Sequence, residues 1–382
     1  MYDSLHKYNY DWTLKDANFT KDKGKVFSCF ACGGGSTMGY KLAGFDVLGC
    51  NEIDKKMMDC YIENHKPKYS YLEPIQEFKL RKDLPKELYN LDILDGSPPC
   101  SSFSIAGNRE KDWGKSKKFR EGQSKQILDT LFFDFIDLAK ELQPKIVIAE
   151  NVKGILIGGA KKYVNAIYKD FDKAGYILQH FVLDASLMGV PQRRQRVFFI
   201  GLRKDLINII DSESRLLLNI PLLDLHFNEK PIVFSEIQTD DFDNKLQKSV
   251  KLRWEIREYG DINLTPADKK LRPEKYANND NAKAFFNCSL LHNNKTPCTI
   301  TTQILSNILY DIPRFMNNDE IIKAGSFPSD YDFQKTKPVY IIGMSVPPIM
   351  TAQIANRIYE QWINKINNLE TQEQKPCKNT KY

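Results

Sequence analysis

The chain has 382 residues, of which 42% are hydrophobic and 27% charged, and its formal net charge is +6 at pH 7. This composition is typical of a globular protein, and the length allows two domains or one large domain with an insertion. No apolar run approaches the roughly 20 residues that span a bilayer, and the first residues do not resemble a signal peptide, so we expect a cytoplasmic protein without membrane association. The mild positive charge permits a nucleic-acid partner but does not require one.

Eight cysteines are present, and in a cytoplasmic protein we expect them to be reduced. Cys29 and Cys32 form a C-x-x-C pair, with Cys50 and Cys60 further along. The second pair is spaced too widely for a typical zinc site, and Cys29 falls within a strand pattern. We therefore predict no metal site.

The first recognisable unit covers residues 25–54. KVFSCFA (25–31) predicts a strand, CGGGSTMG (32–39) a glycine loop followed by a helix, and DVLGCNEID (46–54) a second strand with acidic residues at its end. This order is typical of a nucleotide-binding βαβ unit, in which glycines let the backbone approach the ligand. Glu52, about twenty residues after the first glycines, is placed to accept hydrogen bonds from ribose hydroxyls.

The stretch LDILDGSPPCSSFS (91–104) predicts a buried strand followed by a stiff turn. Pro98 and Pro99 fix the backbone there and present Cys100 beyond the carboxyl end of the strand, where open α/β sheets build their sites. Taken alone, Cys100 could equally be a small buried apolar residue.

A second strand, PKIVIAENV (144–152), ends in Glu150 and Asn151 and follows a predicted helix at 124–142. Between the two strands lies the basic, glycine-containing segment 104–123, which fits either a mobile loop over a polyanion or a solvated surface loop. Successive parallel strands would bring the Cys100 thiol and the Glu150 carboxyl into one crevice.

A helix at 161–175 and strands at 176–184 and 197–202 are predicted next. Arg194 and Arg196 have the same parity in an extended segment, so we expect both to point to one face and to bind phosphate or a base edge, unless they form a surface ion-pair cluster. Residues 206–290 resemble an inserted or appended domain, and residues 295–302 look like a strand. Residues 343–362 predict a long helix, followed by a frayed tail at 364–382. At the other end of the chain, residues 1–24 predict a short helix or an arm laid on the domain.

Together these segments resemble the cytosine-5 methyltransferases, in the order of that family's motifs: FACGGGSTMG, NEID, GSPPCSSFS, AENV, QRRQR, KTPCTITT with RFMNNDEIIKAGSFPSDY, and GMSVPP. The resemblance implies the α/β fold of S-adenosylmethionine-dependent methyltransferases, which is a doubly wound, Rossmann-like sheet. It also implies a smaller, irregular target-recognition domain. We expect residues 1–204 to form the catalytic domain, 205–338 the target-recognition domain and 339–382 a segment that returns to the catalytic domain.

The resemblance also implies the mechanism. The Cys100 thiolate adds to carbon 6 of a flipped-out cytosine, and carbon 5 takes a methyl group from S-adenosylmethionine. Glu150 donates to ring nitrogen 3, which requires a protonated carboxyl near neutral pH. Arg194 and Arg196 hold the flipped nucleotide, and Asn151 positions the Cys100 loop.

By the same resemblance, ten residues contact the cofactor: Phe30, Ala31, Gly33, Gly34, Gly35, Glu52, Ile53, Ile75, Pro98 and Ser345. The chain departs from the family pattern at Cys32, where glycine is usual, at Pro74 in place of an aspartate, at Met344 in place of an asparagine and at Ser101 in place of a glutamine. We therefore expect catalysis, with cofactor affinity the quantity affected.

The resemblance implies double-stranded DNA as the substrate, with residues of about 205–292 recognising a short DNA sequence. A restriction endonuclease acting on the same site is a further implied partner, and the enzyme would act as a monomer. Three alternatives stay open. One is a transfer-RNA cytosine methyltransferase, which carries Cys-Phe-Thr after ENV where this chain has ENVKGILIGG. The others are a nicotinamide-dependent dehydrogenase and a DNA-binding relative with impaired cofactor binding.

Overall fold

The fold is that of a computed structural model. It describes residues 6–99, 130–157, 160–210, 222–240, 246, 251, 254–255, 289–302 and 307–373. The chain divides into two compact units. The larger comprises residues 18–183, 196–226 and 351–382, and the smaller comprises residues 1–17, 184–195 and 227–350. These units overlap with the predicted domains without coinciding with them, because each unit takes three separate pieces of the chain.

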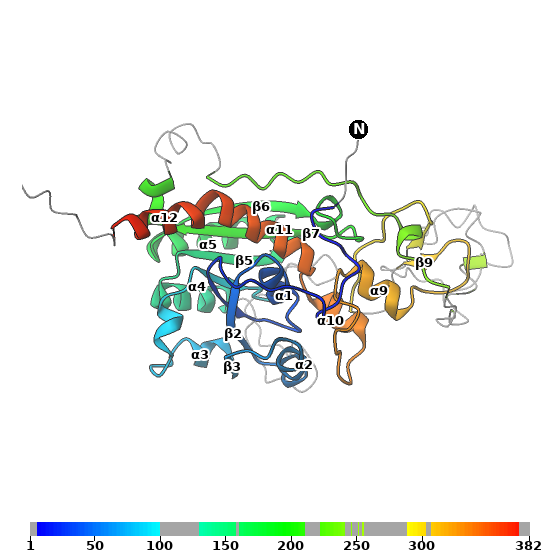
Figure 1. Cartoon of the computed structure of the whole chain (residues 1–382), viewed down its shortest axis with the longest axis horizontal. Helices are drawn as coiled ribbons and strands as arrows, with labels where there is room; N and C mark the ends of the chain where they lie inside the picture. The colour runs from blue at the N-terminus through cyan, green and yellow to red at the C-terminus, as the bar shows by residue number, and fades with distance from the viewer. Residues whose placement is uncertain are drawn as a thin grey trace, which may run out of the picture. The chain divides into compact units, whose positions relative to one another are not determined.

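The larger unit is built on a seven-stranded sheet in the order β3-β2-β1-β4-β5-β7-β6 (Figure 1). The first five of these are parallel neighbours, while β7 runs antiparallel to β5. The strands are β1 (Lys25–Cys29), β2 (Asp46–Glu52), β3 (Tyr69–Leu72), β4 (Ile93–Gly96), β5 (Ile146–Val152), β6 (Tyr176–Asp184) and β7 (Gln195–Arg203).

Helices cover both faces of this sheet because its central strands are apolar on both sides. The helices and short turns of this unit are α1 (Gly35–Leu42), α2 (Lys55–His65), α3 (Ile75–Phe78), η1 (Lys86–Tyr89), α4 (Leu131–Leu142), η3 (Lys153–Leu156), α5 (Lys161–Lys173), η6 (Lys204–Ile210), α11 (Pro348–Ile358), the π-helical turn η11 (Tyr359–Ile363) and α12 (Asn364–Glu373). Phe27 and Leu94 belong to a core shared with α4 and α5. Asp95 points to the opposite face, where it meets Tyr40 of α1.

The predicted α/β sheet is confirmed, and its predicted strands lie within two residues of β1, β2, β4, β5, β6 and β7. Two expectations about local structure were wrong. Residues 295–302 form no strand, because the hydroxyl of Thr296 donates to the carbonyl of Ile232 and the N–H of Cys298 donates to the side chain of Asn307, which leaves Cys298 only an isolated bridge to Arg193. Residues 364–373 form α12 rather than a frayed tail, since Ile366 is fully buried. Of the two alternatives for residues 1–24, a helix is absent from the described part, which begins at residue 6, and the arm remains.

The smaller unit contains little regular structure, as the sequence predicts. Its elements are η5 (Ala185–Leu187), η7 (Phe234–Glu236), β8 (Leu290–Leu291), β9 (Ile308–Leu309), α9 (Asn318–Ala324) and α10 (Pro338–Met344). The N-terminal arm belongs to this unit only up to residue 17, and its Trp12 donates to the carbonyl of Ser326.

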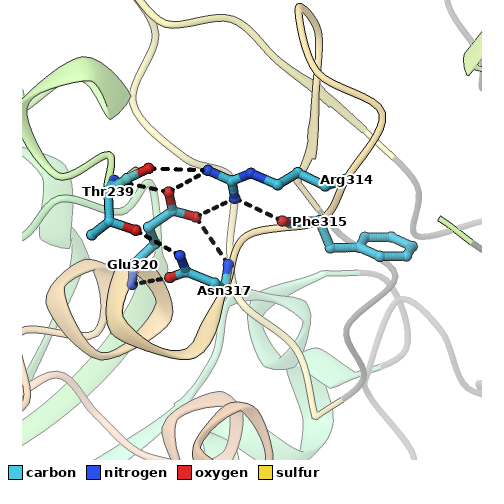
Figure 2. Close-up of polar contacts among 5 residues, drawn as sticks. All are labelled: Thr239, Arg314, Phe315, Asn317 and Glu320. Carbon is cyan, nitrogen blue, oxygen red and sulfur yellow. Dashed lines mark hydrogen bonds and ion pairs between the residues drawn. The ribbon is translucent and has the colours of Figure 1, made fainter. Parts of the chain in front are cut away.

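A network of buried polar contacts links segments of the smaller unit. Arg314 and Glu320 form a buried ion pair, and Asn317 caps α9 through the backbone N–H of Glu320 (Figure 2). Thr239 joins them: its N–H donates to Glu320 and its hydroxyl accepts from Asn317. The network therefore ties Thr239 to the start of α9.

In the described part of the chain, one helical stretch, Pro338–Glu370, is long and apolar enough to cross a membrane, yet 78% of its apolar window is buried within the protein. Burial of this kind is typical of a core helix, so the stretch is weak evidence for a membrane span.

Candidate active site

The loop after β1 bends sharply through three residues with positive φ. Phe30 has φ 52°, Cys32 has φ 48° and Gly34 has φ 83°. The N–H of Gly34 donates to the carbonyl of Ala31 at 2.9 Å, and Gly34 is the N-cap of α1. This turn leaves backbone groups and the first turn of α1 at the carboxyl edge of the sheet, an arrangement that suits a nucleotide-like ligand.

Gly34 cannot be replaced without displacing the helix beneath it. A Cβ at this position would lie 2.1 Å from Nε2 of His65, and its φ is unfavourable for any other residue. His65 packs against Tyr61 with ring centroids 4.5 Å apart, and burial lowers its pKa well below the usual value. A neutral imidazole therefore forms part of the floor under the glycine loop.

Glu52, the predicted ribose ligand, also shapes the loop. One carboxylate oxygen accepts the N–H of Cys32 at 2.8 Å, and the other accepts the N–H groups of Ile53 and Asp54, each at 2.9 Å. The side chain of Glu52 is 5% exposed. It therefore fixes an acceptor group at the tip of β2, beside the glycine loop. The glycine-loop backbone offers hydrogen-bond donors and the fixed carboxylate an acceptor, a combination that suits the adenosine part of S-adenosylmethionine.

The remaining predicted cofactor residues lie in different surroundings. Ile75 begins α3 and is 3% exposed, where it belongs to the core with Phe27 and Phe78. Ser345 belongs to the smaller unit and donates its hydroxyl to the carbonyl of Ile341 at 2.8 Å.

Asn151 holds the backbone that leads to the predicted nucleophile. β4 and β5 are parallel neighbours, with Gly96 opposite Ala149, so their carboxyl ends meet. The amide of Asn151 donates to the carbonyl of Pro98 at 3.1 Å, while its oxygen accepts the N–H of Val152 at 2.9 Å. Cys100 and Ser101 lie outside the described residues, as does the basic segment 104–123.

Glu150 is held by Arg196, whose Nε lies 2.9 Å from Oε1 of the carboxylate. Both side chains are largely buried, at 12% and 14% exposed. The contact exists because β7 runs antiparallel to β5 and places Arg196 opposite Val152. Burial lowers the pKa of the Arg196 guanidinium, and the neighbouring Glu150 opposes that shift.

Arg194 has a different position from Arg196. It lies in the smaller unit, is 2% exposed, and donates to the carbonyls of Ile300 and Gly343, each at 3.0 Å. The structure therefore brings Arg196, but not Arg194, into contact with Glu150. Parity alone did not predict this, because β7 begins only at Gln195.

Two buried polar residues near this edge were not singled out from the sequence: His65 and Asp95. Asp95 offered a signal, because it is an acidic residue inside the otherwise apolar strand pattern LDILDG. His65 offered none. Among the described residues, no group of three or more His, Cys, Asp or Glu side chains could hold a metal ion, and the described cysteines are free thiols.

A sequence model of C-5 cytosine-specific DNA methylases matches residues 24–360, most of the chain. The chain belongs to this family.

Among its relatives, this methylase is 37% identical over 182 residues to the type II methyltransferase M.FnuDI of Fusobacterium nucleatum. That match covers 48% of each protein, so the chain spans about half the length of the first relatives that it matches. The type II methyltransferase M.DdeI of Desulfomicrobium norvegicum is 26% identical over 393 residues, which cover 90% of this chain and 91% of that protein.

Solved structures share the fold. A DNA modification methyltransferase encoded within an E. coli prophage has a TM-score of 0.59 at 20% identity, covering 90% of this chain and 99% of that one. A mutant of DNMT2 from Spodoptera frugiperda has a TM-score of 0.58 at 16% identity, covering 88% of this chain and 99% of that one. At such identities these neighbours support the fold alone.

Proposed function

We propose that this methylase transfers a methyl group to carbon 5 of a cytosine within a short, specific sequence of double-stranded DNA. One observation carries the proposal beyond family membership: the ends of β4 and β5 meet, with Asn151 bound to Pro98 and Glu150 bound to Arg196. A carboxyl group and the approach to a cysteine are thus held at one edge of the sheet. The glycine loop and Glu52 lie at the carboxyl edge of the same sheet.

S-adenosylmethionine, when bound, supplies the methyl group. The Cys100 thiolate adds to carbon 6 of cytosine, since carbon 5 of the intact aromatic ring is a poor nucleophile. Glu150 donates a proton to ring nitrogen 3 as the thiolate adds, which leaves a neutral enamine with a double bond between carbons 4 and 5 and makes carbon 5 nucleophilic. After methyl transfer, nitrogen 3 returns its proton to Glu150, carbon 5 gives its proton to water, and the electron pair left behind re-forms the bond between carbons 5 and 6 as the Cys100 thiolate leaves.

The remaining residues position these groups. Asn151 holds the backbone two residues before Cys100, and Arg196 fixes the carboxyl group of Glu150. Carbon 6 is inaccessible within a stacked duplex, so the cytosine has to rotate out of the helix. Arg194 supports the smaller unit through the carbonyls of Ile300 and Gly343, from which it would order the surroundings of the flipped nucleotide.

Residues of about 205–292 would read the DNA sequence and supply the contacts to bases. The enzyme would act as a soluble, cytoplasmic monomer, since one site flips one base. A restriction endonuclease that cuts the same sequence is the partner expected for an enzyme similar to type II methyltransferases.

Bisulfite sequencing of plasmid DNA from cells that express the chain tests the proposal, with Cys100→Ala as the matched control. We expect protected cytosines in one short recurring context, absent from the control. Protection that persists with Cys100→Ala would exclude the covalent mechanism. No protected cytosine despite folded protein would exclude the DNA substrate, and transfer RNA would then be assayed.

A further inference from the structure

Asp95 is a carboxyl group buried inside the sheet at the point where β4 leads toward the predicted nucleophile. It is 5% exposed. Its two oxygens accept separate hydrogen bonds, one from the hydroxyl of Tyr40 at 3.0 Å and one from the hydroxyl of Ser28 at 3.2 Å. Burying a carboxyl group is costly unless it is hydrogen-bonded, so these partners are needed for the strand to tolerate it.

These bonds connect two functional loops. Tyr40 belongs to α1, which begins at the glycine loop, whereas Asp95 lies five residues before Cys100 on β4. The network continues on the cofactor side: Thr37 of α1 donates to Ser28 at 3.5 Å and shares a hydrogen bond of 2.9 Å with Tyr61. Tyr61 lies under Gly34, where an added Cβ would approach it to 3.0 Å.

The backbone at this end of β4 has little freedom to move independently. The Cβ that Gly96 lacks would lie 2.6 Å from the Phe135 ring of α4, so α4 presses directly on the strand. The N–H of Ser97 donates to the carbonyl of Cys29 at 3.4 Å. A shift of α1 is therefore transmitted through the Tyr40–Asp95 bond to a strand end that moves as one piece.

We propose that Asp95 is a positioning residue that links the cofactor loop to the Cys100 loop, so that cofactor binding sets the position of the thiol. The inference rests on the proposed function and deepens it. It concerns the hydrogen bond between the hydroxyl of Tyr40 and the carboxyl group of Asp95.

Ionisable side chains from β1, α1, α2 and β5 interact with the carboxyl group of Asp95. Burial raises its pKa to about 7, Tyr40 and Ser28 oppose this shift, and Glu150 of β5 contributes to it. Cys29 of β1 and Tyr61 of α2 also interact with its charge. The link should accordingly respond to pH near 7.

Two variants test the link, and one variant controls for the loss of a buried hydroxyl. Asp95→Asn preserves shape but removes the charge, and Tyr40→Phe removes one hydrogen bond. Tyr176→Phe is the control, because Tyr176 is a buried tyrosine that donates to the carbonyls of Pro144 and Ala139, remote from the nucleophile in sequence and on the far side of β5. If Asp95→Asn does not fold, Tyr40→Phe alone carries the test.

The first readout is independent of catalysis. Iodoacetamide alkylation of Cys100 is followed by mass spectrometry of its peptide, with and without S-adenosylhomocysteine at saturation for each variant. We expect the nucleoside to change the alkylation rate about tenfold in the parent and control, and less than about threefold in Asp95→Asn and Tyr40→Phe. The same change in all four proteins would overturn the link, whether or not the parent methylates DNA.

The second readout separates positioning from structural support. We expect Tyr40→Phe and Asp95→Asn to lower kcat about tenfold with little change in KM for S-adenosylmethionine, and Asp95→Asn to flatten the kcat profile between pH 6 and 8. A loss of thermal stability with unchanged kcat and pH profile would reduce Asp95 to a structural residue. A parent that binds the nucleoside but methylates no cytosine would contradict the proposed function while leaving the alkylation result to decide the link.

Discussion

Arg314 and Glu320 bind each other through two hydrogen bonds of 2.8 Å inside the smaller unit, and their side chains are 1% and 0% exposed (Figure 2). The same carboxylate accepts the N–H groups of Thr239 and Asn317. A buried ion pair contributes little net stability compared with apolar residues of the same shape, but each partner depends strongly on the other.

Removing one partner should therefore destabilise the protein severely. We expect Arg314→Met to lower the free energy of unfolding by about 3–5 kcal/mol, because Glu320 is left charged and buried. Urea denaturation followed by circular dichroism measures this. Lys55→Met, which breaks the exposed pair with Asp59, is the control and should have almost no effect. An equally small effect of Arg314→Met would show that water reaches the pair.

Cys32 is held in a backbone conformation that glycine adopts more easily, with φ 48°. Cys32→Gly should relieve a cost of roughly 1–2 kcal/mol, partly offset by the greater freedom of glycine in the unfolded chain. We expect a small rise in Tm, measured by thermal denaturation. Cys29→Gly is the matched control: Cys29 lies in β1 at 1% exposed, so this change should lower Tm. A lower Tm for Cys32→Gly would show that its thiol contributes contacts worth more than the strain.

Glu150→Gln should separate chemistry from cofactor binding. The amide cannot transfer a proton to the cytosine ring, so we expect kcat to fall by roughly 10²–10⁴. The dissociation constant of S-adenosylhomocysteine, measured by calorimetry, should stay nearly constant. Glu141→Gln, an exposed change on α4, controls for the substitution itself. Unchanged turnover would remove Glu150 from the mechanism.

Asp95 also predicts a pH dependence of stability. The pKa of its carboxyl group is about 7 in the folded protein and 3.8 in the unfolded reference, so the folded state binds the proton more tightly. Its contribution is fully present below about pH 4 and is lost as pH rises through 7. The free energy of unfolding of Asp95→Asn relative to the parent should therefore increase by roughly 3 kcal/mol from pH 5 to 8. Parallel curves in urea titrations would contradict this.

Local sequence patterns were sufficient to predict most strands of the sheet and the loops that follow them. The glycine loop with Glu52, and the adjacent ends of β4 and β5, follow from apolar runs punctuated by Gly and Pro, and parallel order was predicted from alternating strands and helices. The contact between Asn151 and Pro98 fits the predicted role of Asn151.

The features that sequence could not predict depend on strand direction and on chain crossing. No local pattern shows that β7 is antiparallel to β5, yet this alone brings Arg196 to Glu150. Their alternate positions predict that Arg194 and Arg196 point to one face, but the chain passes from one unit to the other between Gln195 and Arg196. The tyrosine that binds Asp95 lies 55 residues away in the sequence, beyond the reach of any motif.

The discontinuity of the two units has a consequence for synthesis on the ribosome. The chain passes from one unit to the other after residues 17, 183, 195, 226 and 350. Tyr359 packs its ring against Phe45 of the same unit, with centroids 6.4 Å apart, although 314 residues separate them (359 − 45). At about 5–20 residues per second, the surface around Phe45 waits roughly 15–60 seconds for its covering helix. The nascent chain thus carries exposed apolar surface for most of its translation, and this is the period in which chaperones would bind it.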